Sequence, residues 1–529
     1  MSNKSGKSTD TKKITDSEKK IITASSIFIA AVILITVIVI VIVSVKNKPE
    51  TTDSPTEAQS ETHSDVIKDY MNTDNYTADI LEDGTVSVGS YTGDGNIITV
   101  PDKIKGRAVT QIDSFCFNGN TDVKEIVLPE SVTRICESAF SMCSSLEKIN
   151  LPDSLKIIEA SAFFCCESLT GTLNLPQGVT EIGDYAFAGC LSVTNITIPS
   201  SANKLGAGIF SSCTSLKRVS INSSPDTINS YTFQSCSLLE SLTVPSSVKS
   251  LGDEVFFGCD SLKKLTLPEG ISSIGNNVFG TIPWLETLDT DYLIFGDGIL
   301  ASYLGEETEI TLPDSIKSIA GNSAFMNCPS LKSVTVSSDN KFFSSVDGVL
   351  YSKDGKILEA YPPAKENTGF KIPEGVTEIG KNAFYGCGGI EQIAVPDSVT
   401  KIGYKAFAYS SLSLLELNYK IKVIEDYAFM QCDKLRSFVI PKSAESLGEG
   451  LFFGCDSFAE VFFEPGISQI SGNLFVECPS FVAAHIPESV VNIDENTFKD
   501  CSENFSFFGK SDSYIEKFAK EKEIQFYED

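Results

Sequence analysis

A phrase of about 23 residues recurs along most of the chain, and this repeat limits the possible folds more than any other feature. One clear copy is IGDYAFAGCLSVTNITIP, residues 182–199, in which Phe187 is followed three positions later by Cys190. A fixed period of this size with one aromatic residue per copy predicts a solenoid, because each unit can stack only on its neighbours. The repeated Phe falls at Phe117, Phe140, Phe163, Phe187, Phe210, Phe233, Phe256, Phe279, Phe325, Phe384, Phe407, Phe429, Phe452, Phe475 and Phe498.

Each copy also carries the pattern of a short strand. Leu146, Ile149 and Leu151 are followed by Pro152, and the spacing of two between the last apolar pair is typical of a strand. Pro ends the strand because it cannot donate a ladder hydrogen bond. Stacking such strands at about 4.8 Å per coil predicts a parallel sheet along one side. The predicted interior contains the repeat residues, among them Phe140, Phe163, Phe187, Phe210, Phe233, Phe256, Cys143, Cys166, Cys190 and Cys213.

The N-terminal part of the chain has a different composition. Residues 1–20 are polar and rich in Lys, which predicts a disordered tail. Residues 21–45 contain no charged side chain and would span about 37 Å as a helix, so we expect a single transmembrane signal anchor. A cleaved signal peptide is the competing interpretation, but its apolar region is shorter. The excess of Lys before the span places the N-terminus in the cytoplasm and the rest outside the cell.

Three further boundaries follow along the chain. Residues 46–78 are rich in Ser, Thr and acidic residues and predict a flexible stalk, and residues 79–510 form the predicted solenoid, beginning with a small β cap. Two longer intervals between repeated Phe residues, near 289–310 and 340–370, contain Asp-Gly turns and predict β-hairpins that project from the stack. In residues 511–529, Ser513 and Glu516 have capping-box spacing, which predicts a short helix followed by a strand as a C-terminal cap.

The 15 cysteines permit two interpretations in an exported chain. Twelve of them lie three positions after a repeated Phe or its equivalent, so neighbouring coils would bring them within reach of a disulfide. Cys is also a small apolar residue that suits a tight inward turn, and we therefore favour buried free thiols.

Several classes of function are disfavoured by composition and motif content. The net charge of −28 argues against nucleic acid as a ligand, because binding phosphates requires a basic surface. The chain has only 2 His, one in the predicted stalk and one on a repeat strand, which leaves little for a hydrolytic triad. Phosphate loops, zinc-protease motifs and grouped metal ligands are missing as well, so we predict no catalytic residue, no cofactor and no metal.

The outward strand positions are the candidate contact residues. Most of them are small and polar, as an exposed sheet face requires, but Val439, Phe462 and His485 form an exception. Phe453 lies close to them in the sequence, and Trp284 lies beside the first insertion. The competing interpretation is that a cap or a loop covers these side chains.

The repeated phrase resembles that of the BspA-like leucine-rich repeat family of surface proteins. The resemblance is carried by IPEGVTEIGKNAFYGCGGIEQIAVP at 372–396 and VPDSVTKIGYKAFAYSSL at 395–412, with DGVLYSKDGKILEAYP and ILEDGTVSV as further typical segments. It covers roughly residues 79–529 and implies a mainly β leucine-rich-repeat solenoid. Asn120, Ile282 and Ser410 replace Cys, a departure that affects packing only.

Members of this family are commonly adhesins, so the resemblance implies attachment to an extracellular protein or glycan, such as host matrix proteins or other cells. We therefore expect a single-pass cell-surface protein that binds rather than catalyses. A structural spacer or self-associating surface component is the alternative, and a cell-envelope enzyme is a weaker one.

Overall fold

A computed structural model describes residues 75–470, 472–494, 497–498, 501–502 and 504–529. The predicted tail at 1–20, the predicted membrane span at 21–45 and nearly all of the predicted stalk at 46–78 lie outside these residues. Within the described part of the chain, every helix is too short or too polar to cross a membrane.

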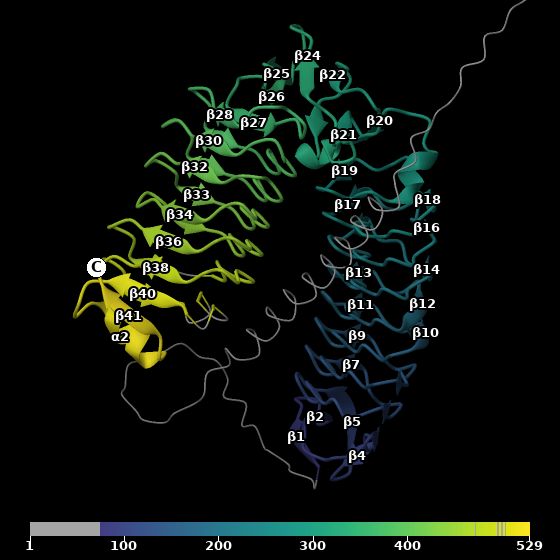
Figure 1. The fold of residues 1–529 in the computed structure, drawn as a ribbon. Helices are drawn as coiled ribbons and strands as arrows, with labels where there is room; N and C mark the ends of the chain where they lie inside the picture. The colour runs from purple at the N-terminus through teal and green to yellow at the C-terminus, as the bar shows by residue number, and fades with distance from the viewer. Residues whose placement is uncertain (1–74, 471, 495–496, 499–500, 503) are drawn as a thin grey trace, which may run out of the picture. The chain divides into compact units, whose positions relative to one another are not determined.

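The chain divides into two compact units, each built of stacked β coils. Unit 1 comprises the described residues up to Pro245 with Val255–Leu267 and Ile282–Trp284, and unit 2 comprises Ser246–Glu254, Pro268–Thr281 and Leu285–Asp529. In both units successive coils contribute short strands that pair from coil to coil in several sheets, and Figure 1 shows these strands as the rungs of each unit. This is the mainly β solenoid that the period predicts.

Unit 1 begins with a β cap and continues as two parallel ladders. The cap strand β1 (Tyr76–Ile80) pairs antiparallel with β2 (Val86–Tyr91), and β4 (Lys103–Ile104) pairs antiparallel with β5 (Arg107–Ile112). One ladder runs from β2 and β5 through β7 (Arg134–Ile135), β9 (Ile157–Ile158), β11 (Glu181–Ile182) and β13 (Lys204–Leu205). The other comprises β3 (Ile97–Thr99), β6 (Glu125–Val127) and β8 (Lys148–Ile149), then β10 (Gly171–Asn174), β12 (Val193–Ile198), β14 (Arg218–Ile221), β16 (Ser241–Thr243) and β18 (Lys264–Thr266). Unit 1 also contains β15 (Thr227–Ile228).

Unit 2 repeats this arrangement. One series of strands begins with β17 (Ser250–Leu251) and β19 (Ser273–Ile274), followed by β21 (Ile299–Tyr303) and β23 (Ser318–Ile319). It continues with β27 (Ile357–Ala360), β29 (Glu378–Ile379), β31 (Lys401–Ile402), β33 (Val423–Ile424) and β35 (Ser446–Leu447). It ends with β37 (Gln469–Ile470) and β39 (Asn492–Ile493). The other contains β22 (Glu309–Leu312) and β24 (Ser333–Val336), then β28 (Gly369–Lys371), β30 (Gln392–Ala394) and β32 (Leu414–Glu416), and finally β34 (Ser437–Ile440), β36 (Glu460–Phe463), β38 (Ala483–His485), β40 (Ser506–Gly509) and β41 (Gln525–Glu528). Unit 2 also contains the 3-10 helix η2 (Asn322–Phe325) and the helix α2 (Tyr514–Glu521), and the 3-10 helix η1 (Pro283–Thr287) lies where the chain passes from unit 1 to unit 2.

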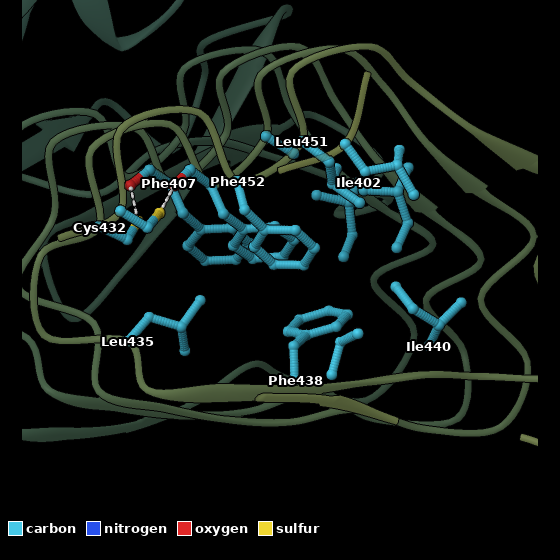
Figure 2. Close-up of a cluster of buried hydrophobic side chains, with 14 of the residues drawn as sticks. Ile402, Phe407, Cys432, Leu435, Phe438, Ile440, Leu451 and Phe452 are labelled. Carbon is cyan, nitrogen blue, oxygen red and sulfur yellow. Dashed lines mark hydrogen bonds between the residues drawn. The ribbon is translucent and has the colours of Figure 1, made fainter. Parts of the chain in front are cut away.

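The repeated Phe rings are buried and stack from coil to coil. The rings of Phe163 and Phe187 lie 5.1 Å apart at 3°, and the series continues to Phe210 at 6.1 Å. Figure 2 shows the same arrangement in unit 2, where Phe407 and Phe452 point into the coil interior. The turn around each ring is tight, and Gly189, two residues after Phe187, adopts φ +72°, which a residue without Cβ adopts at no steric cost.

Fourteen of the 15 cysteines are buried, Cys501 is half-buried, and none of them takes part in a disulfide. The Sγ atoms of the cysteines that follow the Phe residues donate to the carbonyl oxygen of the Phe one coil earlier, as in Cys190 to Phe163 at 3.3 Å and Cys213 to Phe187 at 3.2 Å. Figure 2 shows the equivalent bond from Cys432 to Phe407. The thiol therefore fills the inward turn and also provides a second donor to a carbonyl group that already accepts a backbone N–H.

The two insertions contain the antiparallel strands that the Asp-Gly turns predict. In the first, β20 (Tyr292–Phe295) pairs with β21, and in the second β25 (Phe343–Val346), β26 (Val349–Ser352) and β27 form a meander. The expectation that they project from the stack is wrong. The last strand of each pairs in parallel with the next rung, β21 with β23 and β27 with β29, so each insertion supplies a rung of the ladder.

The C-terminal segment also differs in detail from its prediction. The helix α2 begins after Ser513 and buries Ile515 and Phe518. The Ser513 side chain makes no capping hydrogen bond, and the Glu516 carboxylate instead accepts from the backbone N–H of Asp512 at 2.7 Å. The strand β41 follows and pairs in parallel with β40, so the segment extends the last sheet by one strand.

Candidate functional site

The outward face of the sheet β34–β36–β38–β40–β41 carries a continuous row of large side chains. Register places Val439 beside Phe462, Phe462 beside His485, His485 beside Phe508, and Phe508 beside Tyr527. Side chains alternate between the two faces of a strand, so these positions point away from the interior that Phe438, Val461 and Phe507 fill. We refer to Phe462, His485, Phe508 and Tyr527 as the C-terminal aromatic row.

The four rings of the aromatic row stack face to face. Ring centroids are separated by 4.3 Å between Phe462 and His485, 4.7 Å between His485 and Phe508, and 5.3 Å between Phe508 and Tyr527. The planes deviate from parallel by 15°, 18° and 24° in the same order. Each inner ring therefore has both faces covered by neighbouring rings, and the row presents ring edges outward.

Both nitrogens of His485 contact carboxylates. Nε2 lies 2.8 Å from Oε1 of Glu460 on β36, and Nδ1 lies 2.9 Å from Oδ2 of Asp529, directly after β41. The side chain of His485 is 21% exposed. The ring is thus held in its plane by two polar contacts and between two rings by stacking.

The ends of the row are open to solvent. Val439 is 48% exposed and Tyr527 is 51% exposed, whereas Phe462, His485 and Phe508 are half-buried. The C-terminal cap continues the row through Tyr527, and its helix α2 packs Ile515, Phe518 and Ala519 into the interior. The cap therefore does not cover the aromatic row by placing its own apolar side chains there.

The corresponding positions of unit 1 have a different character. On strands β10 to β18 the matching outward residues are Asn174, Thr197, Ser220, Thr243 and Thr266, all short and polar. Such residues are what a solvated sheet face requires. The aromatic row is therefore a local departure from the repeat.

Two of the predicted contact residues lie elsewhere. Phe453 is 1% exposed and packs beside Tyr427, so its assignment as a surface contact is wrong. Its position directly after the repeated Phe452 places it in the tight turn behind the ring. Trp284 is half-buried in η1 and belongs to unit 1, whereas Val439, Phe462 and His485 belong to unit 2.

Sequence reasoning missed Phe508, Tyr527, Glu460 and Asp529. Phe508 and Tyr527 lie after the last repeated Phe, where the phrase no longer sets the register. The adjacent aromatic pairs in SFFG at 506–509 and QFYE at 525–528 are the signal that could have identified them, because aromatic residues are enriched in strands.

The described residues give no indication of a catalytic centre. Among them, no group of three or more His, Cys, Asp or Glu residues could hold a metal ion. The buried thiols are poor nucleophiles, because burial raises the pKa of Cys143 and Cys213 to about 12.

The chain was compared with known proteins. The profile of the family described as "BspA type Leucine rich repeat region (6 copies)" matches residues 110–238, 170–286, 296–346, 363–445 and 422–519. A search of curated proteins found no match.

Several solved structures are similar to the chain. A leucine-rich repeat protein from Bacteroides ovatus is 24% identical with a TM-score of 0.40, the similarity covering 83% of this chain and 99% of that one. A leucine rich cell surface protein from Faecalibacterium prausnitzii is 24% identical with a TM-score of 0.33, covering 84% of this chain and 95% of that one. A leucine rich repeat protein from T. pallidum is 29% identical with a TM-score of 0.33, covering 40% of this chain and 89% of that one.

The matched ranges together include more than half of the chain, and they coincide with the coils whose Phe rings stack in the structure. The chain therefore belongs to the BspA-type leucine-rich repeat family.

Proposed function

We propose that the protein is anchored in the cell membrane by residues 21–45, displays its solenoid outside the cell, and binds an extracellular protein without catalysis. Host matrix proteins and the surfaces of other cells are the partners that we propose. The observation that carries the binding proposal is the C-terminal aromatic row, which stands where equivalent rungs of unit 1 carry short polar residues. Exposed apolar side chains on a sheet face are a cost unless a partner covers them.

The stacking of the row favours a protein over a glycan. Sugars bind aromatic side chains through open ring faces, but Phe462, His485 and Phe508 cover one another's faces. The row instead offers a ridge of ring edges with Val439 at one end and Tyr527 at the other. Such a ridge fits an apolar groove or strip on a partner protein.

Charge defines the partner further. The chain carries a net charge of −28, and Glu460 and Asp529 lie directly beside the row. Electrostatic complementarity therefore favours a partner whose apolar strip is flanked by Lys or Arg. The partner that we propose is therefore a basic extracellular protein.

The test uses the full-length protein with a panel of matrix proteins and with cells. Phe462→Thr combined with Tyr527→Thr gives the row the residue type of unit 1 and should weaken binding by about 30-fold, the equivalent of about 2 kcal/mol. Thr243→Ala, at the matching strand position of unit 1, should leave binding unchanged. Circular dichroism checks that both variants are folded. Equal affinity of the double variant and the wild type would contradict the proposal.

A self-associating surface component is the second candidate. It is favoured by β41, which ends its sheet within the described residues and exposes Tyr527 at that edge. An edge strand offers backbone groups to a second chain. A sedimentation coefficient that rises with protein concentration would indicate self-association. Loss of that dependence in Tyr527→Thr would support this candidate over the adhesin.

A further inference from the structure

We infer that His485 acts as a proton-operated clamp, which in its doubly protonated form ties Glu460 on β36 to Asp529 after β41 and so holds the last strand and the aromatic row in place. The clamp itself requires no ligand. Its consequence for binding rests on the function proposed above.

The inference follows from the hydrogen-bonding capacity of imidazole. A neutral ring has one N–H donor and one nitrogen acceptor, whereas the protonated ring has two donors. A carboxylate accepts hydrogen bonds and does not donate them when ionised. Because Nε2 and Nδ1 each lie within 2.9 Å of a carboxylate oxygen, only the protonated ring satisfies both contacts.

The surroundings of the ring support a positive charge. The charged groups that contact it are Glu460 from β36 and Asp529 beyond β41, both negative. The neighbouring strand β40 contributes the uncharged ring of Phe508, and β36 contributes Phe462, so a cation lies between two aromatic faces. The ring of Tyr527 on β41 stacks on the face of Phe508 that points away from His485.

Loss of the proton breaks one of the two contacts. The nitrogen without hydrogen then directs its lone pair at a carboxylate. His485, which lies 25 positions from Glu460 and 44 from Asp529, then keeps a hydrogen bond to only one of the two carboxylates. Asp529 is held less firmly than Glu460, since among the described strands β41 pairs with β40 alone and the Asp529 N–H donates one backbone bond to Gly509 at 2.9 Å. We expect β41, with Tyr527, to open more often when His485 is neutral.

Acid favours the protonated ring, so the clamp closes as the pH falls and opens as the pH rises. A surface that depends on the clamp would be well ordered in mildly acidic surroundings. It would bind its partner less well as the pH rises.

Hydrogen–deuterium exchange of the full-length protein at pH 5.5 and pH 8 tests the clamp. After correction for the intrinsic pH dependence of amide exchange, residues 525–528 should exchange about tenfold faster at pH 8. His485→Gln should remove this difference. His63→Gln is the matched control, since the chain has only 2 His, and it should behave as the wild type.

A second variant separates the clamp from simple packing. In Glu460→Gln the side-chain amide can donate to the unprotonated Nε2 while Nδ1–H donates to Asp529, so residues 525–528 should stay protected at both pH values. Equal corrected exchange of the wild type at the two pH values would overturn the inference, as would a wild-type pH response in Glu460→Gln. Failure of the binding proposal has a different signature, because the full-length protein would then bind no partner at either pH while the exchange response persisted.

Discussion

The cysteine at the inward turn shows how one side chain meets two requirements of the coil. The thiol of Cys213 fills a space beside Phe210 and donates to the carbonyl of Phe187 at 3.2 Å. Burial raises its pKa to about 12, so the reactive thiolate is scarce at neutral pH. A disulfide between neighbouring coils would remove two such donors and leave the Phe carbonyls with only their backbone partners, such as the N–H of Cys190 for Phe187.

Thiol labelling of the native and unfolded protein tests this picture. All 15 cysteines should react after unfolding without reductant, whereas the native protein should react slowly. Cys501 is the exception, since it is only half-buried, and it should account for the first labelled thiol. Cys501→Ala should abolish that fast phase, and Cys213→Ala should leave it unchanged. Substantially fewer than 15 thiols after unfolding would contradict the assignment of free cysteines.

A second residue-scale prediction concerns Glu359 on β27. Burial, reinforced by the negative charges of Glu378 and Asp354, raises the pKa of the Glu359 carboxyl to about 7. The folded protein therefore keeps a proton that the unfolded chain has released, and stability falls as the pH rises from the ordinary glutamate pKa of 4.5 to about 7. Above that window the full cost of the buried charge remains.

Glu359→Gln removes this cost. The variant should be more stable than the wild type by about 1–3 kcal/mol at pH 8 and similar in stability at pH 4.5. Urea unfolding monitored by circular dichroism at the two pH values measures the difference. Glu374→Gln, on an exposed turn, is the control and should change stability at neither pH. A gain that is equal at both pH values would exclude the ionisation of Glu359 as its cause.

The stacked Phe rings determine stability at the scale of the element. Phe187 packs between Phe163 at 5.1 Å and Phe210 at 6.1 Å, so removing its ring exposes both neighbours to a cavity. Phe187→Ala should cost about 3–5 kcal/mol in urea unfolding. Phe187→Leu should cost less, since it keeps most of the apolar volume. Equal losses in the two variants would indicate that ring stacking itself, rather than filled volume, dominates.

The repeat made these rungs predictable, because a period of one Phe per coil requires the same side chain in the same place. The Phe and Cys residues named from the sequence are therefore interior in the structure. The pattern does not specify where two-residue strands pair. The ladder that contains β7, β9 and β11 therefore does not follow from the sequence. It also ends after Phe498, and the contacts of His485 with Phe508 on β40 and with Asp529 after β41 lie beyond it.

Phe453 illustrates the remaining difficulty at the candidate site. Phe453 lies close to Phe462 in the sequence, and proximity alone predicts an exposed contact residue. The tight turn after Phe452 instead directs its side chain inward. Outward direction depends on strand register, which Phe462 and His485 share through β36 and β38. Side chains outside the strands cannot be assigned to a face by counting positions.

At the scale of the whole molecule, the coils form a chain of nearest-neighbour contacts. In unit 1, β12 pairs with β10 and β14, and the ring of Phe187 contacts those of the coils immediately before and after it. Stability in such a stack is close to a sum of local terms and interfaces between neighbours. A defect in one coil should therefore weaken its neighbours most.

Hydrogen–deuterium exchange of full-length Phe187→Ala tests this locality. Exchange should accelerate strongly in β10, β12 and β14, which adjoin the altered coil, and should be close to wild type in β36, β38 and β40 of unit 2. Phe452→Ala, which removes a ring between Phe429 and Phe475, provides the reciprocal comparison and should loosen the C-terminal sheet while sparing β10 to β14. A uniform increase across both units in either variant would mean that the chain unfolds as one cooperative block. In that case the aromatic row would owe its order to the entire solenoid rather than to the coils beside it.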